Sequence, residues 1–69
     1  MKYAALIEKT NSGFSAHIPD LPGCVAAGST LEETIELMSG ALGMHLAGMA
    51  ADGEPIPEPR TIASYIVAN

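Results

Sequence analysis

The sequence predicts an α+β fold of order β-β-β-α-β, in which an antiparallel sheet carries one helix packed on it. Two segments near the N-terminus alternate apolar and polar residues, as half-buried strands do. A long segment after Thr30 repeats apolar residues every three or four positions, which indicates an amphipathic helix. Residues 64–67 are β-branched or aromatic apart from one serine, and they predict the last strand.

The first two strands are expected to pair as a hairpin. Apolar residues fall at every second position on one face of each strand: Tyr3, Ala5 and Ile7 within residues 2–9, then Phe14, Ala16 and Ile18. Asn11-Ser12-Gly13 joins the strands as a turn, where Gly or Asn can adopt a positive φ. Ser15 and His17 are expected on the opposite face.

A rigid corner is predicted between the second and third strands. Pro19 has no N–H to donate to a sheet, so the second strand ends before it. Leu21-Pro22-Gly23-Cys24 has Pro and Gly at the two central positions that a type II turn requires. Asp20 is expected to hold the corner through a hydrogen bond to its own neighbouring backbone. A short third strand, residues 25–27, should follow.

The helix carries both a start signal and an unusually wide apolar face. Thr30 and Glu33 have the spacing of a capping box, and Glu32 and Glu36 place negative charge near the N-terminal end. Its apolar positions form two neighbouring stripes: Leu31, Ile35, Met38, Leu42, Leu46 and Met49 in one, and Leu37, Ala41, Met44 and Gly48 in the other. The first stripe should pack on the sheet. The second is our candidate oligomer interface, although core filling is the favoured role for its methionine and the interface is the alternative.

The chain after the helix is expected to cross back over the molecule. Asp52-Gly53 ends the helix, and Pro55, Pro57 and Pro59 force an extended segment. Residues 64–67 are then predicted to be a strand. A short helix capped by Thr61 is the alternative that the sequence leaves open.

Size and charge limit what the protein can do. The 69 residues predict a single domain, residues 1–69, and 48% of them are hydrophobic, more than a lone small domain can cover. We therefore expect a homo-oligomer, a dimer or a tetramer. The net charge of −5, with only three basic residues, argues against direct nucleic-acid binding and favours a basic partner, or simply aids solubility. No membrane span or signal peptide is evident, so a cytoplasmic location is expected.

No residue set predicts catalysis, a metal or a cofactor. The two histidines, His17 and His45, have no Cys or Asp at ligand spacing, so structural or interface roles are favoured. Asp20 invites comparison with metal-dependent nucleases, but two-metal chemistry needs several converging carboxylates, which the sequence does not supply. Cys24 is the only cysteine, and we expect it to be a small buried residue.

Five segments, in order along almost the whole chain, resemble the HicB family, the antitoxin half of HicA/HicB toxin–antitoxin pairs. They are Tyr3 to Glu8, Gly13-Phe14-Ser15-Ala16, Pro19 to Cys24, Gly28-Ser29-Thr30-Leu31-Glu32-Glu33-Thr34, and Gly53-Glu54-Pro55-Ile56-Pro57-Glu58-Pro59. The resemblance implies a partial ribonuclease H-like fold with the same element order. It also implies binding to a HicA-like toxin, a small basic messenger ribonuclease, whose RNA-binding and active-site surface the antitoxin covers.

Three classes of function remain open from the sequence. The toxin-binding inhibitor is favoured, a small oligomeric interaction module of unknown partner that is not linked to a toxin is the main alternative, and a divergent nuclease is the least favoured. For the first, the rigid corner made by Asp20, Leu21, Pro22 and Gly23 is our candidate partner interface, because a preorganised turn loses little entropy on docking. The alternative is that the corner is purely structural.

Overall fold

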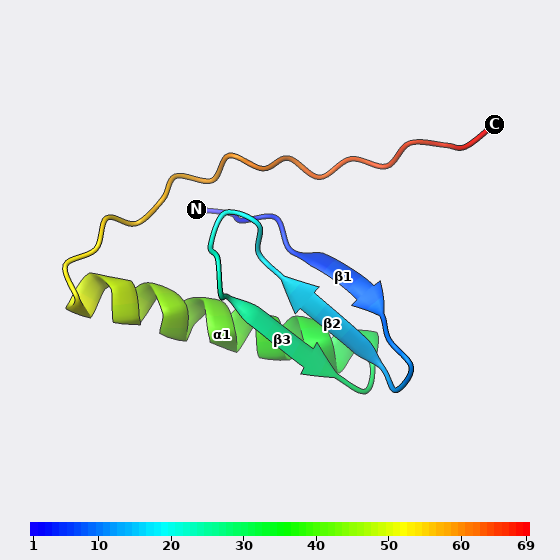
Figure 1. The fold of residues 1–69 in the computed structure, drawn as a ribbon, viewed down its shortest axis with the longest axis horizontal. Coiled ribbons are helices and arrows are strands. Elements are labelled where there is room, and N and C mark those ends of the chain that lie inside the picture. The colour runs from blue at the N-terminus through cyan, green and yellow to red at the C-terminus, as the bar shows by residue number, and fades with distance from the viewer.

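Three strands and one helix form the folded part of the protein, seen in a computed structural model that describes residues 1–69 (Figure 1). The strands are β1 (Leu6–Lys9), β2 (Phe14–His17) and β3 (Val25–Gly28), and the helix is α1 (Leu31–Ala51). The sheet is antiparallel in the order β1-β2-β3, with α1 lying across one of its faces. The predicted α+β class is confirmed. The structure contains no helix with the length and hydropathy that a membrane-spanning helix needs.

The predicted alternation places the sheet's two faces correctly. Ile7, Ala16 and Ala26 lie opposite one another across the three strands, and all three pack in or against the core under α1. On the outer face the corresponding row is Leu6, His17 and Val25, which is exposed. Strand β1 is shorter than the predicted residues 2–9, because β2 ends at His17 and leaves the residues before Leu6 without a ladder partner.

The turn between β1 and β2 needs its glycine for a different reason than the sequence suggests. Only Gly23 and Gly53 have positive φ, so the expectation of a positive φ within residues 11–13 is wrong. Instead, a Cβ placed on Gly13 would lie 2.2 Å from the carbonyl oxygen of Gly28. The glycine therefore allows the hairpin turn to touch the end of β3.

The helix begins as predicted at Thr30. The Thr30 hydroxyl accepts a hydrogen bond from the Glu33 N–H at 3.1 Å. The Glu33 carboxylate accepts one from the Ser29 N–H at 2.6 Å, one residue earlier than in a standard capping box. Thr34, which is fully buried, donates its hydroxyl proton to the Thr30 carbonyl at 2.8 Å, so this polar group has a partner in the core.

The core is small. Its five buried apolar residues come from β2, the corner and α1: Ala16, Ile18, Leu21, Cys24 and Met38. Only six of the 69 residues are buried in the single chain. So much exposed apolar surface agrees with a chain that has surfaces left for other molecules.

Residues 64–67 form neither the predicted fourth strand nor the alternative helix. From Glu54 to Asn69 the chain has no regular secondary structure and runs as an extended ribbon past the sheet edge beside β1 (Figure 1). No backbone–backbone hydrogen bond involves a residue beyond Glu54. The residue types favour a strand, but a strand also needs a neighbour to bond, and the single chain does not provide one at this position.

Candidate partner-binding surface

The corner between β2 and β3 is a type II turn, as its Pro-Gly pair predicts. The Cys24 N–H donates to the Leu21 carbonyl at 3.0 Å, and Gly23 has a φ of +87°. A further bond, from the Ile18 N–H to the Cys24 carbonyl at 3.1 Å, closes the corner at its base. The loop is therefore held in one shape by its own backbone.

Asp20 does not bond its own neighbours, so that expectation is wrong. Its carboxylate instead accepts hydrogen bonds from the backbone N–H groups of Arg60 and Thr61 at 2.8 and 3.0 Å, and from the Thr61 hydroxyl at 2.7 Å. These bonds, the Thr61 backbone first, hold the pKa of Asp20 below its ordinary value because they favour the charged carboxylate. Asp20 thus anchors the chain at residues 60 and 61 to the corner.

The four residues of the candidate partner interface have different environments. Leu21 is 1% exposed and belongs to the core, where it supports the corner from below. Asp20 is partly covered by the segment that it anchors, whereas Pro22 and Gly23 are exposed at the tip. Of the four residues, Pro22 and Gly23 at the tip are therefore the ones that present a free surface to a partner.

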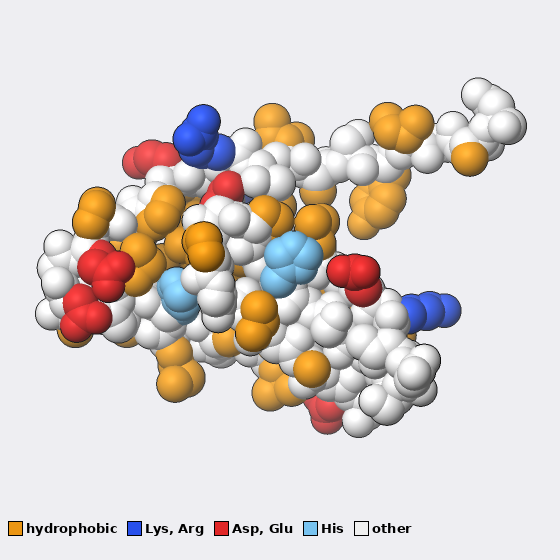
Figure 2. All heavy atoms as spheres, in the orientation of Figure 1, with side chains coloured by type: hydrophobic (Ala, Val, Ile, Leu, Met, Phe, Trp, Pro, Cys, Tyr) orange, Lys and Arg blue, Asp and Glu red, His pale blue; other side chains and the backbone are white.

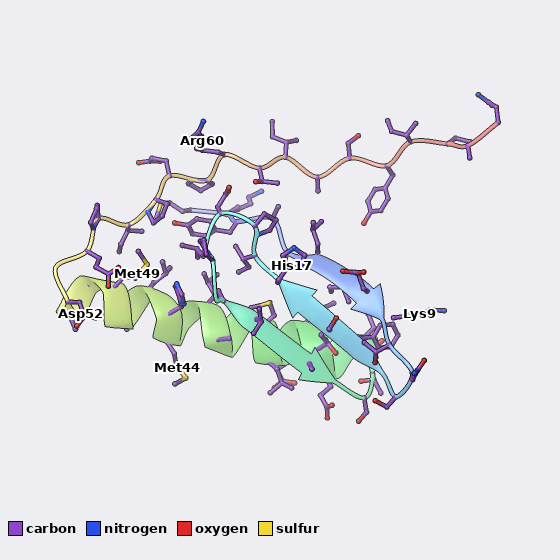
Figure 3. The ribbon with its side chains drawn as sticks, in the orientation of Figure 1. Lys9, His17, Met44, Met49, Asp52 and Arg60 are labelled. Atoms are coloured by element: carbon purple, nitrogen blue, oxygen red, sulfur yellow. The ribbon has the colours of Figure 1, made fainter.

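The second helix stripe lies on an accessible side of α1. Leu37, Met44 and Gly48 are exposed, and Ala41 is partly covered by the core. Met44, at 79% exposed, points away from the sheet (Figure 3), so it is not core filling in the single chain. A Cβ on Gly40, Gly43 or Gly48 would meet nothing within 4 Å, so no close backbone contact within the chain explains these glycines.

The corner tip and the helix stripe meet in one groove. The groove, about 440 Å³ in volume, is lined by the corner, the C-terminal half of α1 and the chain that follows it: Leu21, Pro22, Met44, His45, Gly48, Met49, Asp52, Glu54 and Pro57. Sequence reasoning missed the last three residues, because it treats Asp52 only as the end of the helix, while Glu54 and Pro57 join the groove only when the chain folds back after Gly53. We call this the corner groove.

The rim of the corner groove is acidic. Asp52 lies at the C-terminal end of α1 (Figure 3), and Glu54 follows two residues later. Acidic side chains gather around this end of the helix (Figure 2). No lysine or arginine lines the groove, in which His45 is the one imidazole. The field of the two carboxylates therefore extends into solvent and favours a positively charged ligand or partner.

The remaining chemical groups are scattered. His17 is on the outer face of the sheet and His45 lines the corner groove. Cys24 is buried, and burial raises the pKa of its thiol, so the reactive thiolate is disfavoured. No three acidic, histidine or cysteine side chains are grouped so that they could hold a metal ion.

The fold so far defines a class: a small acidic α+β protein with one helix on a three-stranded antiparallel sheet. A family model described as the HicB-like antitoxin of bacterial toxin–antitoxin systems matches residues 3–69. The chain therefore belongs to the HicB-like antitoxin family, as its sequence motifs predict.

Similar proteins come from phage and bacteria. The chain is 41% identical over 66 residues to a 14.9 kDa protein from the rep-hol intergenic region of Haemophilus phage HP1, covering 96% of this chain but only 50% of the phage protein. It thus spans about half the length of that relative. UPF0150 proteins of Synechocystis sp. and Helicobacter pylori are 33% and 38% identical, over 81% and 70% of this chain and 72% and 67% of theirs.

A solved structure shares the fold. A chain of the HicA3 and HicB3 toxin–antitoxin complex superposes with a TM-score of 0.75 at 32% sequence identity. The match covers 86% of this chain and 70% of that one. The arrangement of three antiparallel strands followed by a helix is therefore that of a toxin–antitoxin protein.

Proposed function

We propose that this protein is an antitoxin that binds a small basic HicA-type messenger ribonuclease and neutralises it by covering its RNA-binding and active-site surface. The observation that carries the proposal is membership of the HicB-like antitoxin family, supported by the structural match to a toxin–antitoxin complex. In this role the protein acts in the cytoplasm, by binding rather than by catalysis.

The corner groove is the surface that we assign to the toxin. It combines three properties that suit this partner: a tip fixed by backbone bonds, exposed apolar atoms from Pro22 and Met44, and the carboxylates of Asp52 and Glu54. The apolar centre supplies contact area, while the carboxylates speed the encounter with a basic protein. Leu21 supports this surface without facing the toxin.

The direct test uses the products of the genes that flank this one, beginning with any that is small and basic. Binding is measured by calorimetry, and neutralisation by the fraction of messenger RNA left intact when the two proteins are mixed. We expect a stable complex and protection of the RNA. A protein that binds no such neighbour, and no other basic ribonuclease, supports the interaction module without a toxin instead.

The assigned surface is tested with two charge-neutralising double variants. Asp52→Asn with Glu54→Gln changes the corner groove, and Glu32→Gln with Glu36→Gln makes the same charge change at the other end of α1. We expect the first pair to slow association several-fold at low salt, and the second pair to slow it less. Equal effects would mean that the toxin docks elsewhere or senses only net charge.

A further inference from the structure

The C-terminal residues 62–67 combine an extended backbone with almost complete exposure of large apolar side chains. Ile62, Tyr65, Ile66 and Val67 are between 85% and 97% exposed. None of these residues makes a backbone or side-chain hydrogen bond. So much exposed apolar surface on one short, unpaired, strand-forming stretch marks an interaction segment. We call residues 62–67 the C-terminal segment.

The C-terminal segment lies beside the open edge of the sheet but forms no backbone hydrogen bonds with β1. A groove of about 700 Å³ separates the two, with the edge strand β1 on one side and residues 61–65 on the other. Leu31 and Ile35 of α1 and Phe14 of β2 also line it, so the groove is mostly apolar. We call it the edge groove.

The anchor at Asp20 fixes the point from which the C-terminal segment starts. Its bonds to Arg60 and Thr61 fix the chain just before the C-terminal segment begins. From this point the segment runs in the same direction as β1, from the anchored end towards the C-terminus (Figure 1). Two unsatisfied edges therefore face each other across the edge groove, one on β1 and one on the segment.

We propose that the edge groove is filled by the C-terminal segment of a second copy of this chain, so that two copies exchange strands. A twofold axis perpendicular to the sheet reverses the direction of the second copy's segment, which then runs antiparallel both to β1 and to the first copy's segment. The same axis places the first copy's segment in the second copy's groove, as a closed, self-complementary interface requires. Both grooves are filled by one operation.

The resulting sheet has no mismatched neighbours. From one end to the other the order is β3, β2, β1, the second copy's segment, the first copy's segment, and then β1, β2 and β3 of the second copy. Every adjacent pair in these eight strands is antiparallel, so one regular ladder continues across the dimer. The exposed edge of β1, which would otherwise invite uncontrolled pairing, is covered in both copies.

Side-chain alternation fits this position. In an extended segment Ile62, Ser64 and Ile66 lie on one face, with Ala63, Tyr65 and Val67 on the other. One face meets the half-exposed Leu31 and Ile35 on the helix side of the sheet. The other face continues the exposed outer row that contains Leu6 and Val25. The segment carries no charge that would have to be buried.

This dimer does not depend on the toxin. It also uses other residues than a dimer held by the helix stripe would, so mutations can distinguish the two kinds of dimer. In the exchanged sheet each segment has a neighbour on both sides, and each of its N–H groups is needed. Ser64→Pro removes one N–H and is not tolerated in a central strand, whereas Ser64→Ala keeps the N–H and serves as the matched control. Met44→Glu tests the helix stripe.

The experiment is sedimentation equilibrium of the full chain over a range of micromolar concentrations, with amide hydrogen exchange followed for residues 62–67. We expect the wild type, Ser64→Ala and Met44→Glu to be dimers with protected amides in the segment, and Ser64→Pro to sediment at the 7.1 kDa of a monomer. The circular dichroism spectrum of Ser64→Pro should still show the helix, so that loss of the dimer can be distinguished from loss of the fold.

Three results would overturn the proposal. A monomeric wild type with unprotected segment amides means that nothing fills the groove. A monomer with protected amides means that the segment closes on its own β1. A dimer that survives Ser64→Pro and is lost in Met44→Glu means that the helix stripe holds the copies together.

Discussion

The first 53 residues and the last 16 residues follow different rules in the same chain. In the first region each strand pairs with the next strand along the chain, and the backbone hydrogen bonds close within strands, turns and the helix. In the second region the Glu54 N–H still bonds the Met49 carbonyl, and beyond it only Tyr3 and Asp20 bond the chain, at Pro57 and at residues 60 and 61. Residues 25–28, which include two alanines and a glycine, pair as β3, whereas the strand-forming residues 64–67 stay unpaired, so an available neighbouring edge decides where a strand forms.

The largest difference between the two regions should appear when large apolar side chains are truncated. Leu21→Ala removes a side chain that is 1% exposed and should destabilise the fold by about 2–5 kcal/mol. Ile66→Ala, made in the Ser64→Pro background so that only single chains are compared, should change stability by less than about 0.5 kcal/mol. Urea unfolding followed by circular dichroism measures both.

Leu21→Ala also decides the role of the corner. A stable variant that has lost toxin binding would mean that Leu21 leaves the core to meet the partner, contrary to its burial. A destabilised variant that binds normally at low temperature fits a supporting role beneath the corner groove.

Glycines separate close packing from open surface within the first region. Gly13→Ala forces a Cβ against the Gly28 carbonyl and should cost about 1–3 kcal/mol, because backbone on both sides must move. Gly40→Ala meets nothing and should stabilise the helix by about 1 kcal/mol. Thermal unfolding of the two variants compares them. If Gly40→Ala is destabilising instead, another molecule approaches the helix at this position.

The predictions from sequence succeeded where signals are local. The alternation of β2, the Pro22-Gly23 turn and the Thr30 cap are each set by residues within four positions of one another, and all three are present. The same local patterns favoured core filling for Met44, and that expectation is wrong, because its side chain is 79% exposed.

The other predictions that were wrong concern contacts between residues that are distant in sequence. The Asp20 carboxylate accepts hydrogen bonds from Arg60 and Thr61, which are 40 and 41 positions away in sequence. The corner groove gains Glu54 and Pro57 only through the fold-back after the helix. A carboxylate next to a turn has backbone N–H groups of the turn close by. The sequence pattern therefore predicts these local groups as the donors, instead of the distant ones that Asp20 bonds. Likewise, the β-forming run at residues 64–67 says nothing about which edge it should pair with.

The cap of α1 tests whether the first region is as locally determined as its bonds suggest. Thr30→Ala removes the acceptor for the Glu33 N–H and should cost about 1 kcal/mol. Thr30→Ser keeps the acceptor and should restore most of this loss. Both values come from chemical denaturation, and a neutral Thr30→Ala would show that water or Glu33 alone satisfies the helix end.

The smallest effect, and the one that links the two regions, is the response of the Asp20 anchor to pH. The pKa of Asp20 in the folded protein lies below the ordinary value of 3.8, because the charged carboxylate accepts bonds from Thr61 and Arg60. The stabilisation is therefore complete above the ordinary pKa and is lost as pH falls through the lowered one. We expect the amide resonances of Arg60 and Thr61 to move together in a titration with its midpoint below 3.8, while that of Gly23 at the corner tip stays in place. In Asp20→Asn, whose side-chain oxygen accepts bonds but does not titrate, both amides should keep a constant shift across the same range. A midpoint at or above 3.8 in the wild type would mean that the carboxylate is not held by these donors in solution, and that the C-terminal segment begins from a free rather than an anchored chain.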